Sequence, residues 1–192
     1  YESGDNRKPV IFLFPGTCCL YSSFDHVLDG LHSYFYTVTV SYDGFDPNEK
    51  TEFYSMEDEC EKIEQEIRKK YGGRIYLVAK IQSSMVVPFM YKMVHTGTLP
   101  KFMQKKLDKT DGGKKELYNG FLNMFGIGKG GSPWITKQSI YNQFYSDLVT
   151  KVQHGIDVPG TTIHVFYATK MGEKYEKRYC TYFKNPDIRK HN

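Results

Sequence analysis

Cysteine is scarce in this chain, and its placement lacks the pattern of a zinc site or a disulfide framework. The four cysteines stand at positions 18, 19, 60 and 180, with no C-x-x-C motif and no nearby pair of histidines. Cys18 and Cys19 are adjacent, which makes a disulfide between them unfavourable. We therefore expect no metal site, and we predict a reduced, cytoplasmic setting for the protein.

Long apolar runs and a concentrated basic surface are also missing. No stretch of about 18 apolar residues occurs, so we expect no stable insertion into a membrane. The formal net charge is only +4, and the lysines are scattered along the chain instead of forming one basic stripe. Nucleic-acid binding proteins usually carry such a stripe, so we expect no nucleic-acid partner.

The residues that are present predict an alternation of strands and helices. The chain has 192 residues, of which 40% are hydrophobic, and this is enough to bury a substantial core. Apolar and β-branched runs alternate with segments that have the apolar spacing of amphipathic helices. Strands are predicted at residues 10–14, 36–41 and 74–78, and the last of these is predicted to be buried. Helices are predicted at 24–31 and 56–67, the second opened by a capping box at Ser55 and Asp58. Short connections between them favour a parallel sheet.

The segment 9–25 contains the predicted site. Its continuous apolar run is typical of a strand buried on both faces, and it stops at a Pro-Gly pair before a helix begins. The turn therefore follows the carboxyl end of a strand, where open α/β sheets bind ligands. Because unpaired backbone N–H groups can stabilise an oxyanion, we predict that Thr17 and Cys18 donate to one. The alternative is a strand–helix turn that binds no ligand.

Three further residues are predicted to line a pocket beside these donors. Gly16 and Cys19 belong to the same turn, and Asp43 follows the next strand at the same edge of the sheet. For Asp43 a role in turn formation is the competing interpretation.

The second half of the chain changes character. Residues 79–158 are predicted to form amphipathic helices rich in aromatic residues and methionine, and residues 159–192 return to a strand, a helix and the start of another strand. The glycine-rich stretch 126–131 contains a lysine, but it follows a helix and lacks the order of a phosphate-binding loop. We interpret it as a hinge between helices.

In this order the motifs resemble the α/β-hydrolase superfamily, in the form that carries a helical cap. F-P-G-T-C-C resembles the oxyanion loop of that family, and V-S-Y-D-G-F-D resembles the end of its next strand. G-G-R-I-Y-L-V resembles the strand that delivers the nucleophile, and H-V-F-Y-A-T-K-M-G-E-K-Y resembles the late strand and helix near the acid position. The resemblance covers most of the chain.

The resemblance implies a fold and an activity. The fold would be α/β, with a mostly parallel, doubly wound sheet formed by residues 1–78 and 159–192 and a helical cap inserted at 79–158. The activity would be that of an esterase or acyl hydrolase on a small apolar or aromatic ester, through a Ser-His-acid mechanism without a cofactor. The partner would be a small-molecule substrate, and a homodimer is compatible with the sequence.

The chain departs from the family pattern where the nucleophile and the histidine are expected. The G-x-S-x-G elbow should follow Val78, but the sequence there contains Ser83 and Ser84 without the glycines that the strained turn needs. No carboxylate stands in register at the acid position, and Glu173 is displaced from it. We expect that a segment at the 78/79 junction and a C-terminal tail with the histidine are missing from this sequence. The alternative is a non-catalytic protein of the same fold that binds a ligand or partner.

Overall fold

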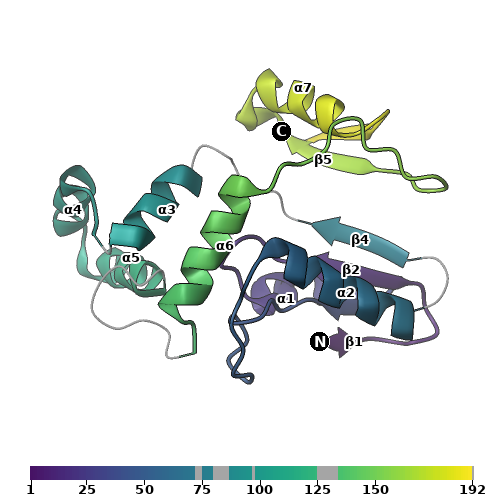
Figure 1. Cartoon of the computed structure of the whole chain (residues 1–192), viewed down its shortest axis with the longest axis horizontal. Helices are drawn as coiled ribbons and strands as arrows, with labels where there is room; N and C mark the ends of the chain where they lie inside the picture. Colours follow the sequence, from purple (N-terminus) through teal and green to yellow (C-terminus); the bar gives the residue numbers. More distant parts are fainter. Residues whose placement is uncertain (72–74, 80–86, 97, 125–133, 192) are drawn as a thin grey trace. The chain divides into compact units, whose positions relative to one another are not determined.

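A computed structural model describes residues 1–71, 75–79, 87–96, 98–124 and 134–191 of the chain (Figure 1). It divides the chain into two compact units, Tyr1–Val149 and Thr150–Asn192. The predicted division into a core of residues 1–78 and 159–192 with a cap of residues 79–158 stays a prediction. Within the described residues, no helix is long and apolar enough to cross a membrane.

The first unit contains a four-stranded sheet in the order β1-β3-β2-β4. Its strands are β1 (Glu2–Ser3), β2 (Val10–Phe14), β3 (Tyr36–Thr39) and β4 (Ile75–Ala79). β2 runs parallel to both β3 and β4, with Val10 opposite Tyr36 on one side and Ile75 on the other, whereas β1 is antiparallel to β3. The three strands predicted from the apolar runs are therefore present and parallel.

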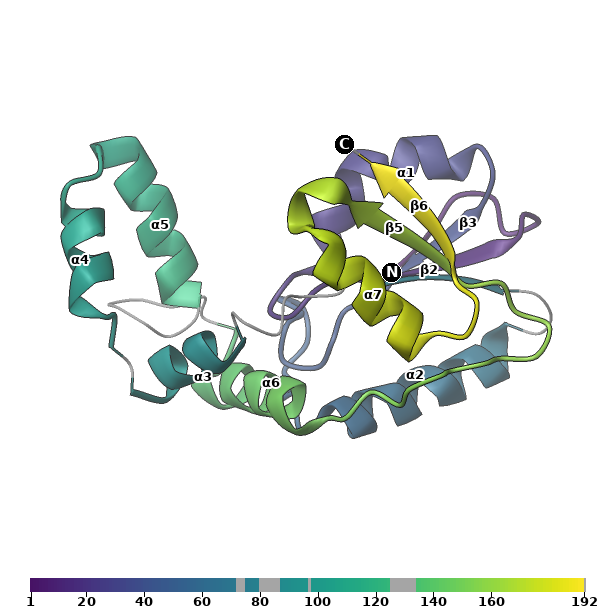
Figure 2. The ribbon, with the colours of Figure 1, turned by 90° about the horizontal axis from the view of Figure 1, so that it is seen from above.

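Helices lie on the two faces of this sheet. A short 3-10 helix, η1 (Tyr21–Phe24), leads into α1 (Asp25–His32), and α2 (Met56–Lys70) follows β3. Ile11 and Leu13 face α1. On the other face, the ring of Phe12 packs against the ring of Tyr71, directly after α2, with the ring centroids 5.1 Å apart. Figure 2 shows α1 and α2 on opposite sides of the strands. The Ser55 hydroxyl accepts the Asp58 N–H at 3.2 Å, which confirms the predicted cap.

The prediction that residues 74–78 form a buried strand is wrong in one respect. β4 forms, but Tyr76, Leu77 and Val78 are 37%, 59% and 42% exposed. The reason is its position in the sheet, because among the described strands β4 pairs only with β2 and ends the sheet. An apolar run alone does not distinguish a central strand from an edge strand.

Four helices complete the first unit. They are α3 (Val87–Thr96), α4 (Lys101–Asp108), α5 (Gly112–Met124) and α6 (Lys137–Val149). α3 packs on α6, and buried residues of both helices form one apolar cluster with Cys18 after β2 and with two loop phenylalanines, Phe45 and Phe53. This cluster joins the helices to the loops at the carboxyl ends of β2 and β3. A doubly wound sheet and a helical cap stay predictions.

The second unit is a strand–helix–strand motif. β5 (His164–Ala168) leads through a 3-10 turn, η2 (Thr169–Met171), into α7 (Glu173–Tyr182), and β6 (Asp187–His191) returns parallel to β5. Val165 and Tyr167 point from one face of β5 into a small core with Tyr179 of α7. The predicted strand, helix and second strand of this segment are all present.

Replacing Gly44 with alanine tests the contact between the loop after β3 and α6. Gly44 has φ +76°, and a Cβ there would lie 2.3 Å from the Oγ of Ser139 and 3.0 Å from the N of Phe53. Ser139 is fully buried and accepts the Phe53 N–H. We expect Gly44→Ala to lower the free energy of unfolding by about 3 kcal/mol in a urea titration.

Gly30→Ala is the matched control. Gly30 is exposed in α1, and nothing lies within 4 Å of the position that its Cβ would take. This change should raise stability by roughly 0.5–1 kcal/mol, because alanine favours helix. Equal stabilities for the two variants would contradict the close packing of Gly44 on α6.

Candidate functional site

The turn after β2 is tight and its backbone is strained at one residue. The Cys19 N–H donates to the Gly16 carbonyl at 2.9 Å, and the Tyr42 hydroxyl donates to the Pro15 carbonyl at 3.2 Å. Cys18 has φ +56°, a left-handed conformation that costs a non-glycine residue about 1 kcal/mol. Such strain persists only where surrounding contacts hold it.

Two side chains of α6 make those contacts. The Cys18 N–H donates to the Oε1 of Gln143 at 2.6 Å, and the Thr17 hydroxyl donates to the Oδ2 of Asp147 at 2.7 Å. Cys18 is 2% exposed and Gln143 is 0% exposed. The two predicted oxyanion donors are thus brought to one helix, and the Cys18 N–H is already bonded to an oxygen of the chain itself.

Sequence reasoning did not identify Gln143 or Asp147. α6 was predicted as one of several amphipathic helices, on the basis of its apolar residues. The only signal was a polar pair spaced four residues apart, which lies on one helical face. That spacing does not predict that this face contacts a turn more than 120 residues earlier in the chain.

Burial sets the protonation of the groups around this turn. It raises the pKa of the Cys18 thiol well above its ordinary value, and the nearby Asp147 and Cys19 raise it further. The thiol therefore stays protonated at neutral pH, which makes Cys18 a poor nucleophile. Burial also raises the pKa of Asp147, while the hydrogen bond from Thr17 opposes this shift.

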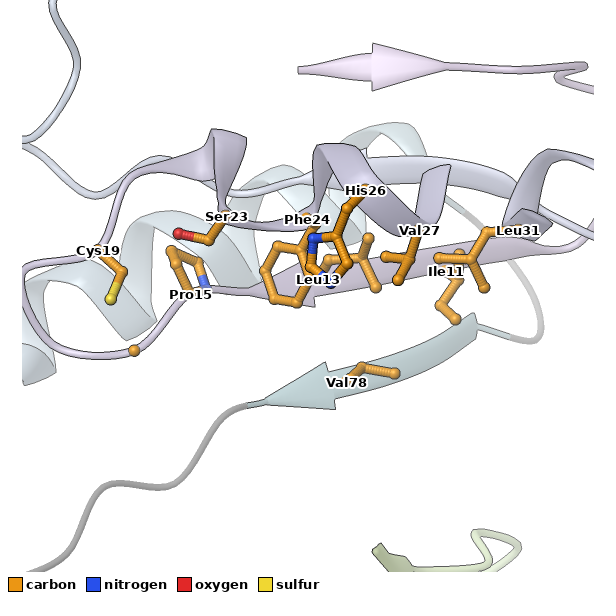
Figure 3. Close-up of a pocket in the computed structure, with 11 residues that line it drawn as sticks. Ile11, Leu13, Pro15, Cys19, Ser23, Phe24, His26, Val27, Leu31 and Val78 are labelled. Atoms are coloured by element: carbon orange, nitrogen blue, oxygen red, sulfur yellow. The ribbon is translucent and has the colours of Figure 1, made fainter. Parts of the chain in front are cut away.

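A cavity of about 440 Å³ lies beside the turn, on the face of β2 and β4 that α1 covers (Figure 3). This volume is in the range of small-molecule sites. Gly16 and Cys19 are among its lining residues, and Asp43 is not. The lining is mostly apolar and consists of Ile11, Leu13, Pro15, Gly16, Cys19, Ser23, Phe24, His26, Val27, Leu31 and Val78.

Asp43 instead belongs to an acidic group at the start of α2. Carboxylate oxygens of Asp43, Asp58 and Glu59 lie within 4.8 Å of one another, which is close enough to hold a cation. The Lys62 ammonium already lies between two of them, 2.6 Å from Asp43 and 2.5 Å from Asp58. Glu59 is 3% exposed, and burial together with the charge of Asp43 raises its pKa to about 7.

Among the described residues, two histidines pair with oxygen side chains near the amino ends of strands. The hydroxyl of Ser3 is 2.9 Å from the Nε2 of His32, near the start of β3. The Nδ1 of His164 is 2.8 Å from Asp187, and these are the first residues of the parallel strands β5 and β6. Ligands of α/β sheets bind at the opposite, carboxyl ends, so we interpret both pairs as structural.

Several predicted features lie outside the described residues. Ser83 and Ser84 and the glycine-rich stretch 126–131 are among them. Near the predicted acid position, residues 169–171 form η2, and Glu173 begins α7 with its side chain exposed.

Comparison with solved structures shows which fold this is. A protein from Desulfitobacterium hafniense, described as belonging to the α/β hydrolase family, matches with a TM-score of 0.61 at 11% identity; the match covers 99% of this chain and 89% of that one. An esterase from a marine microorganism matches with a TM-score of 0.60 at 13% identity, covering 100% and 89% of the two chains.

A third match is 1H-3-hydroxy-4-oxoquinoline 2,4-dioxygenase, for which no organism is named, with a TM-score of 0.54 at 14% identity, covering 100% of this chain and 86% of the other. No family model matches the chain, and no curated protein does either. At these identities the likeness establishes the fold, and the chain has the α/β-hydrolase fold.

Glu59 should make the stability of the protein depend on pH. Its pKa is raised in the folded state from 4.5 to about 7, so the folded state binds this proton more tightly than the unfolded chain does. The resulting stabilisation is complete below about pH 4.5 and is lost as the pH rises through 7. Between pH 5.5 and 8.5, urea titrations should show a loss on the order of 2 kcal/mol.

Glu59→Gln should abolish most of this loss, because glutamine does not titrate. Glu61→Gln, an exposed position on the same helix, is the control and should keep the wild-type dependence. A Glu59→Gln protein that loses as much stability as the wild type would show that another group is responsible.

Proposed function

We propose that this protein, with its α/β-hydrolase fold, is a hydrolase of the esterase or acyl-hydrolase type that acts on a small apolar or aromatic ester. A serine attacks the acyl carbon, a histidine takes the proton of the serine and passes it to the leaving alcohol, and a carboxylate orients the histidine. The turn after β2 stabilises the negative oxygen of the tetrahedral intermediate. No cofactor takes part.

The observation that carries this proposal is the hydrogen bond of the Cys18 N–H. This donor stands at the carboxyl end of a buried strand, and its acceptor is an amide carbonyl oxygen at 2.6 Å. A substrate oxygen that replaced the Gln143 oxygen would meet the same donor at a similar distance. A charged oxygen forms a stronger hydrogen bond than a neutral one, so the replacement favours the tetrahedral intermediate. Thr17 is the second donor of the proposal.

The cavity supports the predicted size and polarity of the substrate. Gly16 and Cys19 of the turn line it, so an acyl group held there would lie close to the donors. Its apolar walls suit an alkyl or aromatic group, and Ser23 and His26 are its polar side chains. The structural likeness to an esterase supports the reaction class, whereas the likeness to a dioxygenase is a reminder that this fold hosts other chemistry.

The proposal requires a serine and a histidine that lie beside the turn after β2. Neither the Ser3–His32 pair nor the His164–Asp187 pair can fill these roles, because both lie at the amino ends of strands. The buried Cys18 thiol is not a substitute nucleophile, since its raised pKa keeps it protonated.

Labelling and turnover of the full-length protein, produced from its complete gene, test this function. We expect a fluorophosphonate probe to label one serine, and we expect hydrolysis of p-nitrophenyl butyrate and p-nitrophenyl phenylacetate above the rate of heat-denatured protein. Pre-treatment with the probe should remove both activities. Absence of labelling together with absence of turnover would refute serine catalysis.

The alternative is a non-catalytic protein of the same fold that binds a small ligand or a partner. The observation in its favour is that the Ser3–His32 and His164–Asp187 pairs of the described residues both lie at the amino ends of strands, where they do not suit acyl transfer. Saturable binding of an apolar carbonyl compound without labelling or turnover would support it.

A further inference from the structure

We infer that Gln143 is an internal ligand of the turn after β2, which withholds the Cys18 N–H from neutral carbonyl oxygens and yields it only to a negatively charged oxygen. Gln143, on a helix far from the turn in sequence, then sets how strong an acceptor an acyl oxygen must be before the turn binds it. This inference rests on the proposed function, because it concerns the oxygen of the acyl group that the turn would bind.

The amide oxygen of Gln143, and not its amide nitrogen, faces the turn. Cys18 presents a backbone N–H, which can only donate, so the amide atom that faces it at 2.6 Å is the oxygen. Gln143 is 0% exposed and Cys18 is 2% exposed. The bond is therefore shielded from water, and an incoming oxygen reaches this donor only if the Gln143 side chain moves.

The oxygens that compete for the Cys18 N–H differ in charge. The oxygen of a neutral ester and the oxygen of the Gln143 amide are both uncharged carbonyl acceptors, so exchanging one for the other yields little free energy. An oxyanion is about twice as strong an acceptor. The turn therefore gains by binding the tetrahedral intermediate and gains little by binding the unreacted ester. Glutamine at this position therefore weakens the binding of every acyl oxygen equally, and only an oxyanion gains enough free energy to displace it.

The Gln143 side chain is docked in a way that makes it easier to displace. The Nε2 of Gln143 is buried and has no hydrogen-bond partner among the described residues. An unsatisfied buried donor destabilises the docked side chain, and it would regain a partner once it reached water. Cys18 is also held in a left-handed conformation. Both features lower the cost of releasing Gln143, whereas the second contact, from Thr17 to Asp147, can keep α6 beside the turn.

Gln143→Met tests the inference in the full-length protein, because methionine has a similar length and lacks the amide oxygen. Removing the internal ligand should strengthen the binding of the ester and of the tetrahedral intermediate by the same factor. We expect KM for p-nitrophenyl phenylacetate to fall about fivefold with kcat almost unchanged. A merely structural role for Gln143 would instead lower kcat or leave KM unchanged or raised.

Asn142→Leu is the matched control. Asn142 is the neighbouring residue on α6, and its amide donates to the carbonyl of Phe53, in the loop after β3, at 2.9 Å. This change removes that bond and the bond that Asn142 accepts from Gln138, and it should leave KM unchanged. A fivefold fall of KM in both variants would mean that any loosening of α6 has the effect, and would overturn the assignment to Gln143.

Ligand binding separates this inference from the proposed function. The probe is 1-phenylpropan-2-one, a neutral ketone that cannot be hydrolysed, and phenylacetate is its charged counterpart. By calorimetry, Gln143→Met should bind both the ketone and phenylacetate about fivefold more tightly than the wild type does, because the internal hydrogen bond competes with both ligands. These measurements need no turnover, so they remain decisive if serine labelling fails. Equal ketone affinity in the wild type and the variant would overturn the inference.

Discussion

The contact between α6 and the loops that follow β2 and β3 is the interaction on which the rest of the first unit depends. Its apolar part is a cluster that includes Ile140 and Phe144 of the helix with Phe45 and Phe53 of the loop after β3. Its polar part satisfies backbone N–H groups that would otherwise be buried without a partner. Ser139, Gln143 and Ser146 accept the N–H groups of Phe53, Cys18 and Met56, respectively.

This polar contact explains how a turn at the edge of the sheet can be both strained and well defined. Because Cys18 is in a left-handed conformation, the turn would relax if its N–H were free. The Cys18 N–H donates to the side chain of Gln143, whose amide nitrogen has no partner among the described residues. The hydrogen bond from the Cys18 N–H to Gln143 therefore orders the turn and also occupies the donor that a substrate would use in the proposed function.

The sequence predicted the local elements well because each depends on neighbouring residues. The run in residues 10–14 is apolar enough to form a buried strand, and Ser55 caps α2 through a bond to a residue only three positions away. The exposure of β4 could not be predicted in the same way. Whether an apolar strand is buried depends on what pairs with it, and its sequence of Ile, Tyr, Leu and Val is equally compatible with the centre or the edge of a sheet.

In the candidate site, too, some features depend on neighbouring residues and others depend on tertiary contacts. The sequence by itself determined that a turn follows a buried strand at Gly16 to Cys19, because the Pro-Gly pair interrupts the apolar run there. Only the tertiary structure decided that Asp43 faces Lys62 instead of the cavity and that Gln143 binds Cys18. The physical reason is distance along the chain: the partners of Cys18 and Thr17 lie 125 and 130 residues away, and only packing of α6 on the loops brings them into hydrogen-bond range.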